Sequence, residues 1–267
     1  MFIRRILFFA VAFACAACQT VQTTQPGAVG VERKQLMLVS EQQVEQGAQE
    51  AYQQELSKAR TRGALNTNPE HYQRVQRISK KLIPHTSVFR PDATQWKWEI
   101  NVQTSEDVNA YCMPGGKIMV YTGLIEELQA TDAELAAVIG HEIAHALREH
   151  SRERISRAYA EQLALTGVAV ATGASDSVMS IASQVSAVTF TLPHSREQEA
   201  EGDRIGLELM ARAGFDPNAA ITLWQKMGKL GGGGPPEFLS THPSSTSRIK
   251  DLEANVPRVL PLYKAAQ

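Results

Sequence analysis

The chain has 267 residues, of which 43% are hydrophobic and 21% are charged, a composition typical of a folded globular protein rather than a disordered one. Its 27 basic and 28 acidic residues give a formal net charge of -1, so neither a basic surface nor a nucleic-acid partner is expected. Only one of the three cysteines, Cys112, lies in the body of the chain, which excludes an internal disulfide framework and a cysteine-based zinc site. Any metal must therefore be held by histidine and carboxylate side chains.

Residues 1–17 have the features of a secretory signal peptide. Arg4 and Arg5 form a short cationic region, and a run of apolar or small residues extends from Ile6 to Ala17. This run is shorter than the roughly 20 residues that a membrane-spanning helix needs, so a permanent helical anchor is not expected. We therefore predict that the protein is exported to the periplasm.

The residues that end this segment resemble the lipobox of bacterial lipoproteins, in which a cysteine becomes the acylated first residue. Cys18 would be that residue, although Cys15 stands where a leucine is usual. The alternative is cleavage by the ordinary signal peptidase without lipidation. Because residue 19 is Gln rather than Asp, the resemblance implies a protein lipid-anchored to the outer membrane of a Gram-negative bacterium.

Residues 18–34 are rich in Thr, Gln, Pro and Gly and have almost no large apolar side chains, which predicts a flexible tether. A single folded domain is predicted over residues 35–267. Its first elements are two helices, Ser40 to Arg60 and Pro69 to Ile83, which we expect to pack on each other as an N-terminal pair.

A short region of β-structure is predicted next. Alternating apolar and polar residues from Trp96 to Gln103 predict a half-buried strand. Two further strands, Val108 to Met113 and Lys117 to Thr122, flank a Pro-Gly-Gly turn and predict a hairpin. The second of these strands is expected to bind an extended substrate peptide by edge pairing. The residues proposed for this role are Lys117, Ile118, Met119, Val120 and Tyr121.

The helix that begins at Thr131 carries the residues on which the function depends. It is apolar nearly all round, as buried helices are. His141 and His145 are one turn apart, about 6 Å along one face, so both can bind one zinc ion, and Glu142 can reach a water beside it. The alternative is a pair of hydrogen-bonded core histidines. His150 is expected to lie on the opposite face of the same helix, in solvent.

A third zinc ligand is expected on the helix predicted within residues 195–214. Glu199 and Asp203 continue the apolar line that passes through Leu207, which places both carboxylates on the buried side. We predict Glu199 as the third ligand and Asp203 as the acceptor of a hydrogen bond from a ligand histidine. The alternative for Glu199 is a simple ion pair with Arg196. The other face carries alternating charges and is expected in solvent: Glu197, Glu201, Arg204, Glu208 and Arg212.

Three segments together resemble the HtpX and CAAX-prenyl-endopeptidase family of zinc metallopeptidases: Asn109 to Ile118, His141 to His145, and Glu199 to Asp203. The resemblance covers about residues 70 to 255 and is strongest to an exported bacterial branch without membrane spans. It implies a zincin-like domain, α+β and mostly helical, with a small antiparallel sheet beside the HExxH helix and one zinc ion per chain. In that family the Glu of an ExxxD pattern is the third ligand, which is Glu199 here. Gly202 departs from the family, where Ala usually precedes the Asp.

The resemblance also implies an activity, the hydrolysis of peptide bonds. Zinc would be held by His141, His145 and Glu199, with Glu142 as the general base. The expected substrates are unfolded or misassembled envelope proteins, with the outer-membrane assembly machinery as a further partner. The competing interpretation is a zinc-stabilised periplasmic chaperone or binding protein that holds its clients without cleaving them. Glu142 favours the enzyme, because a purely structural site has no use for a carboxylate beside an open coordination position.

His242 is predicted to control access to the metal. It follows a glycine-rich loop, residues 231–234, and precedes the final helix. The resemblance supports this role, because exported relatives carry a His-Pro segment followed by Arg-Ile, here Arg248 and Ile249, with the histidine near the metal. An imidazole in the fourth position would hold the enzyme latent. The alternatives are a solvent-exposed histidine at a helix entry and a packing residue.

Overall fold

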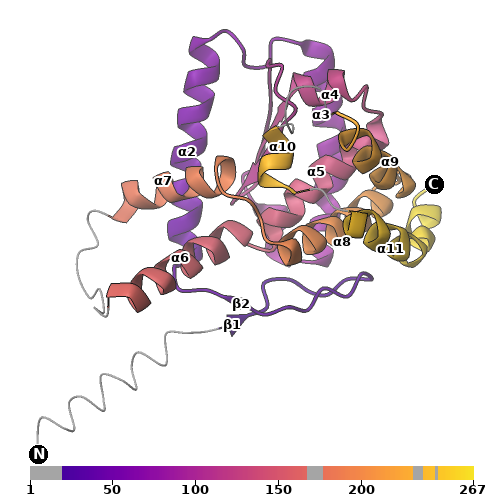
Figure 1. The fold of residues 1–267 in the computed structure, drawn as a ribbon. Helices are drawn as coiled ribbons and strands as arrows, with labels where there is room; N and C mark the ends of the chain where they lie inside the picture. The colour runs from indigo at the N-terminus through magenta and orange to yellow at the C-terminus, as the bar shows by residue number, and fades with distance from the viewer. Residues whose placement is uncertain (1–19, 167–176, 231–236, 244–245) are drawn as a thin grey trace, which may run out of the picture.

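The computed structural model describes residues 20–166, 177–230, 237–243 and 246–267. The predicted signal peptide, Cys18 and the loop at residues 231–234 therefore lie outside the described residues. Helices dominate the described chain, with two small sheets (Figure 1), which confirms the predicted α+β, mostly helical class. None of the described helices combines the length and the apolar character that crossing a membrane requires.

The elements follow one another in this order: β1 (Thr20–Val21), β2 (Gln35–Leu36), α2 (Glu41–Thr61), α3 (Pro69–Leu82), the 3-10 helices η1 (Ile83–Val88) and η2 (Pro91–Gln95), β3 (Glu99–Gln103), β4 (Ala110–Met113), β5 (Lys117–Tyr121), α4 (Thr122–Glu127), α5 (Asp132–Leu147), α6 (His150–Thr166), α7 (Ser177–Phe190), α8 (Arg196–Arg212), α9 (Asn218–Met227), α10 (Glu237–Thr241) and α11 (Thr246–Ala265). Three predicted helix starts are confirmed, because Ser40, Asn68 and Thr131 each accept a hydrogen bond from a backbone N–H in the first turn.

The two N-terminal helices do not form the predicted pair. α2 packs mainly against α7, in a cluster of buried apolar residues that includes Ala48 and Val185. α3 packs mainly against α5 and β3 and contributes Val75 and Ile78 to the main core. Each helix has one apolar stripe, and the local pattern that reveals the stripe does not say which other element will cover it.

The larger sheet has the strand order β3-β5-β4, with β5 in the centre. β4 and β5 form the predicted antiparallel hairpin, with Tyr111 opposite Met119. β3 runs parallel to β5, with Ile100 opposite Ile118, so the sheet is mixed and the prediction of an antiparallel sheet is wrong. The cause is that β5 lies between β4 and the earlier strand β3. Because β3 runs in the opposite direction to β4, it is parallel to β5.

The central place of β5 also overturns the substrate-strand prediction. Both of its edges are paired with neighbouring strands, so it has no free backbone groups for an added peptide. Its five residues, Lys117, Ile118, Met119, Val120 and Tyr121, are all buried. The sheet instead ends at β3 on one side and at β4 on the other.

Residues 20–34 are not the flexible tether predicted over residues 18–34. This segment passes below α6 and α8 in the view of Figure 1, and Val29 and Val31 are buried in the main core. The backbone N–H of Val29 donates to the carboxylate of Glu208 at 3.0 Å. The linker-like composition was misleading because two valines and a few buried polar contacts are sufficient to attach an extended segment to a folded domain.

The crossing of α5 and α8 positions the candidate site. Gly140 of α5 faces Gly206 of α8, and a Cβ atom at residue 206 would lie 2.7 Å from the backbone nitrogen of His141. Larger residues would therefore force the two helices apart. The close crossing brings the carboxylates of α8 next to the histidines of α5.

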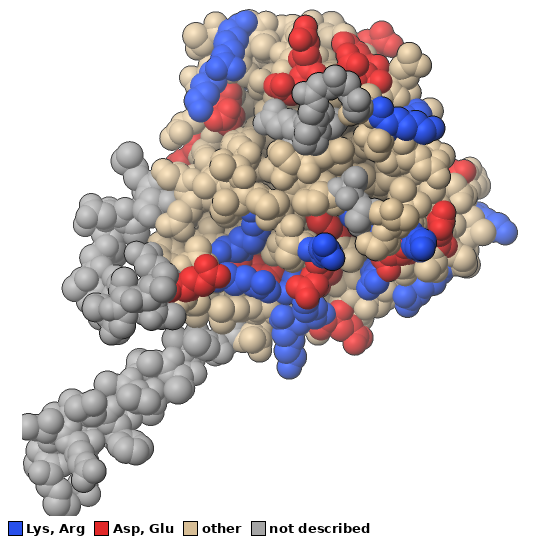
Figure 2. All heavy atoms as spheres, in the orientation of Figure 1, with Lys and Arg blue, Asp and Glu red and all other residues tan. Residues whose placement is uncertain are grey.

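On the molecular face drawn in Figure 2, acidic and basic side chains are interspersed, so this face has no continuous basic surface.

Candidate metal centre

Four buried side chains converge on one point: His141 and His145 from α5, Glu199 from α8, and His242 after α10. Their ligand atoms all lie within 4.8 Å of one another. The Nε2 atom of His141 is 3.0 Å from Nε2 of His145 and 3.2 Å from Nδ1 of His242. Two donors bound to one zinc ion at 2.0–2.1 Å in tetrahedral geometry are about 3.3 Å apart. Three imidazoles and one carboxylate at this spacing fit a metal ion.

Glu199 lies where the helix pattern places it. Its Oε1 atom is 3.5 Å from Nε2 of His145, and its Oε2 atom is 3.7 Å from Nε2 of His141. Its ion-pair partner is Arg248 of α11 rather than Arg196. Burial raises the pKa of Glu199, but the positive charges of His242 and Arg248 outweigh this effect, so the pKa lies below its usual value and the carboxylate is charged.

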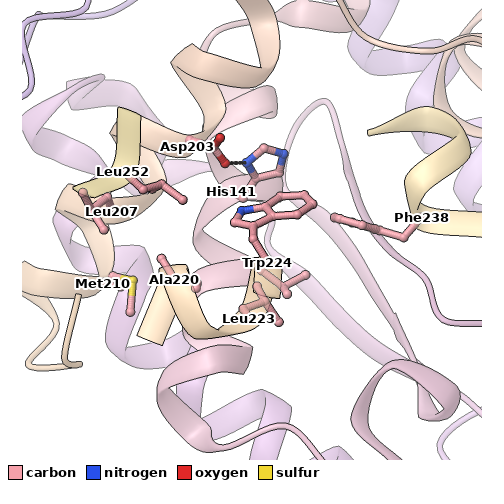
Figure 3. A pocket seen from close by; sticks show the side chains of 11 residues that line it. His141, Asp203, Leu207, Met210, Ala220, Leu223, Trp224, Phe238 and Leu252 are labelled. Carbon is pink, nitrogen blue, oxygen red and sulfur yellow. Dashed lines mark ion pairs between the residues drawn. The ribbon is translucent and has the colours of Figure 1, made fainter. Parts of the chain in front are cut away.

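Asp203 is positioned to orient His141. Its Oδ1 atom is 3.1 Å from Nδ1 of His141, the contact marked by the dashed line in Figure 3. Arg248 donates two hydrogen bonds to the same carboxylate, each 2.7 Å long. Burial raises the pKa of Asp203, but Arg248 and the nearby His141 outweigh this effect and lower the pKa to about 2. The charged carboxylate lies beside Nδ1 of His141, and Nε2 of the same ring faces the other ligand atoms, an arrangement that suits the predicted orienting role.

Gly202 leaves room for both ligand histidines. A Cβ atom at this position would lie 2.9 Å from Cε1 of His141 and 3.0 Å from Nε2 of His145. A glycine inside a helix is destabilising by up to about 1 kcal/mol relative to alanine. In this chain the glycine allows α8 to approach the two imidazoles closely.

Glu142 has an unpaired oxygen beside the convergence point. Its Oε1 atom is buried and has no hydrogen-bond partner among the described residues, and it lies 3.5 Å from Nε2 of His242. Burial raises the pKa of Glu142 above its usual value. A buried carboxylate oxygen of this kind requires a partner such as water, and its raised pKa suits it to accept a proton near neutral pH.

His242 lies inside the site rather than in solvent. Its Nδ1 atom is 3.0 Å from Oε1 of Glu199, and its ring stacks on Phe238 of α10, with ring centroids 4.4 Å apart. The backbone of His194 supports the same segment, because its N–H donates to the carbonyl of Thr241 at 2.9 Å. Burial lowers the pKa of His242, but Glu142 and Glu199 outweigh this and raise it above its usual value.

An apolar pocket adjoins His141 (Figure 3). Trp224 of α9 and Phe238 of α10 line it, together with apolar side chains of α5, α8 and α11. Its free volume of about 10 Å³ is room for about one water molecule. Arg248 lies over the Trp224 ring, with its guanidinium carbon 3.7 Å from the ring centroid. In this arrangement, α10 and its neighbours close the apolar side of the site.

Two residues behind His145 were expected in solvent but are buried: His150 and Glu201. The predicted helix ends at Leu147, and Glu149 has a φ angle of 53°, so α6 starts afresh at His150 and turns it inward. Glu201 is covered by the N-terminal segment that was predicted to be a tether. No Gly or Pro marks the break between α5 and α6 in the sequence. The short distance in sequence between His145 and His150 is therefore the only sequence signal that His150 lies near the HExxH residues.

Sequence reasoning also missed two further residues near the site. Arg248 was noted only as part of a pattern, whereas in the structure it contacts both Asp203 and Glu199. His194 was not noted at all, and its ring centroid is 4.1 Å from that of His145. Both residues come from loops or helices remote in sequence from the HExxH helix, so no local pattern indicates their contacts.

Comparisons with known proteins agree with this geometry. The model of peptidase family M48 matches residues 11–256. The mitochondrial metalloendopeptidase OMA1 of Schizosaccharomyces pombe is 36% identical over 216 residues, which cover 79% of this chain and 60% of that protein. OMA1 of Arabidopsis thaliana is 42% identical over 175 residues, 64% of this chain and 34% of that protein. The metalloprotease LoiP of Escherichia coli is 29% identical over 258 residues, 94% of this chain and 96% of LoiP. The chain thus spans between 34% and 60% of the length of these two OMA1 relatives.

Proposed function

Because the chain belongs to peptidase family M48, we propose that it is a zinc-dependent endopeptidase that cleaves unfolded or misassembled proteins of the bacterial envelope. The observation that carries the proposal is the buried convergence of His141, His145 and Glu199 with His242, which lies 3.5 Å from an unpaired oxygen of Glu142. A purely structural metal site would not require a free carboxylate beside it.

The side chains of the site divide the chemistry of peptide hydrolysis among them. When bound, zinc supplies a Lewis acid that polarises the scissile carbonyl and makes water a better nucleophile near neutral pH. His141, His145 and Glu199 would hold it. Glu142 would take a proton from the attacking water and return it to the leaving amine. The raised pKa of Glu142 favours this exchange, because the group must accept and release a proton in one cycle.

The edge strand β4 replaces β5 as the proposed binding site for the substrate backbone. β4 lies at one end of the sheet order and packs against α5, which carries the ligand histidines. An extended peptide added to this edge would be held mainly by main-chain hydrogen bonds, which depend little on sequence. Such binding favours unfolded chains. In this structure the N–H of Phe238 donates to the carbonyl of Val108, just before β4, at 3.1 Å.

The cellular location is proposed from the N-terminal sequence. The apolar run from Ile6 to Ala17 supports export, and Cys18 supports a lipid anchor on the periplasmic side of the outer membrane. The similarity to a metalloprotease of Escherichia coli over 94% of the chain supports a bacterial protease. Unfolded envelope proteins are the proposed clients, and the outer-membrane assembly machinery is the proposed source of misassembled ones.

Metal removal tests the proposed function. The purified protein is expected to contain about one zinc ion per chain and to cleave unfolded casein, and a chelator should abolish the cleavage until zinc is restored. Zinc content is measured by atomic emission and cleavage by release of labelled peptides. Retention of unfolded casein without cleavage by the zinc-loaded protein would instead favour the chaperone alternative.

His242 is proposed as a latch on the same site. With its ring between Phe238 and Glu199, it occupies the space where a fourth ligand would bind. Because three ligands remain, His242→Ala should keep zinc stoichiometry. Basal cleavage should rise about tenfold if the latched form makes up about nine tenths of the population. His85→Ala, on η1, is the control. Unchanged or lower cleavage by a folded His242→Ala protein would exclude a latch.

A further inference from the structure

We propose that His150 and Glu201 form a hydrogen-bond relay that orients His145 toward the metal. Both are positioning residues in this proposal, because neither touches the substrate or the metal. The relay rests on the proposed zinc site, and it assigns a role to two buried polar residues that the hydrolytic mechanism does not use.

The relay is a continuous chain of short contacts behind His145. The Nδ1 atom of His145 is 2.7 Å from Nδ1 of His150. On the far side of the second ring, Nε2 of His150 is 2.9 Å from Oε2 of Glu201. The side chain of His150 is fully buried, so water does not compete for either nitrogen. Both contacts have hydrogen-bond lengths.

The chemistry of Glu201 determines which atoms of this relay donate and which accept. An ionised carboxylate can only accept, so a neutral His150 carries its proton on Nε2 and leaves Nδ1 as an acceptor. His145 must then donate from Nδ1. The lone pair of His145 is therefore on Nε2, the atom that faces His141 and Glu199. This is the tautomer that can bind a metal at that position.

Two arginines keep Glu201 ionised and in place. Arg33, from the N-terminal segment, donates to both carboxylate oxygens at 2.7 and 3.0 Å. Arg148 donates to the same two oxygens at 3.1 and 3.2 Å. Together with His150, they surround this buried carboxylate with positive charge and hydrogen-bond donors. The N-terminal segment thus contributes to the support of a metal ligand.

A second metal ion is a weaker explanation of the same cluster. His145, His150 and His194 also lie close enough to hold an ion. However, the 2.7 Å between the Nδ1 atoms of His145 and His150 is shorter than the roughly 3.3 Å expected for two donors on one zinc ion. The guanidinium of Arg154 also lies 3.3 Å from Nε2 of His194, and this positive charge disfavours a cation nearby.

Zinc affinity of His150 variants tests the relay. His150→Phe keeps the ring but removes the acceptor, and we expect its zinc Kd to rise about 10- to 100-fold, as for other residues that orient metal ligands. His150→Asn keeps a polar group near the position of Nδ1 and should restore most of the affinity. Glu201→Gln is expected to weaken binding, whereas Glu197→Gln, on the exposed side of α8, should not. Competition with a fluorescent chelator measures Kd, and circular dichroism checks the fold.

A measurement on the wild-type protein makes the test independent of any variant. Nitrogen-15 NMR of labelled histidines reports which ring nitrogen carries the proton. The relay requires His150 to be protonated on Nε2 and His145 on Nδ1. A proton on Nδ1 of His150, or a folded His150→Phe protein with wild-type zinc affinity, would overturn the relay. Failure of the wild-type protein to bind zinc would instead contradict the proposed function, and the His150 tautomer would still decide the relay.

Discussion

Replacing Glu142 by Gln is expected to lower the cleavage of unfolded casein by about 10²- to 10⁴-fold, the usual contribution of a general base. Glutamine has nearly the same shape but cannot take a proton from water. Its side chain is not one of the four converging ligands, so zinc content and the melting temperature should change little. The expected result is therefore a folded protein that keeps its metal and loses its activity.

The control for this substitution is Glu127→Gln, which makes the same chemical change at an exposed position on α4. Cleavage is followed as the initial rate of peptide release, and zinc is counted per chain in the same samples. Equal rates for Glu142→Gln and the wild-type protein would remove Glu142 from the mechanism. Loss of zinc together with activity would show that its carboxylate is a ligand and not a base.

Replacing Glu199 by Ala is expected to weaken zinc binding about 10²- to 10³-fold. Zinc bound by a set of four protein donors is worth about 10–16 kcal/mol, or roughly 2.5 to 4 kcal/mol for each donor. The substitution removes the only carboxylate among the converging ligand atoms. It also removes a charge partner of the buried Arg248, so a lower melting temperature is expected as well.

Glu197→Ala is the matched control for this ligand, because it removes a carboxylate from the same helix at an exposed position. The zinc Kd of each variant is measured by competition with a chelator, at equal protein concentration. Wild-type affinity in Glu199→Ala, or a larger loss in Glu197→Ala, would show that the assigned face of α8 is wrong.

Local sequence is sufficient to predict the elements and ligands that depend on neighbours in the chain. The helix starts at Ser40 and Thr131 and the hairpin of β4 and β5 follow from short patterns, and the structure has them. In the same way, residues four apart on a helix share one face, which places His141 with His145 and Glu199 with Asp203. These predictions hold because helix geometry alone determines the spacing.

The tertiary structure decides which surfaces are covered and where the chain turns between elements. β5 lies in the centre of its sheet because of a long-range pairing with β3, and Glu201 is buried because Arg33 lies over it. The break between α5 and α6 at Glu149 turns His150 toward His145, and no Gly or Pro in the sequence indicates this break. Each outcome depends on contacts between residues far apart in the chain. A periodic pattern records which face of a segment is apolar or charged, but it does not record what packs against that face.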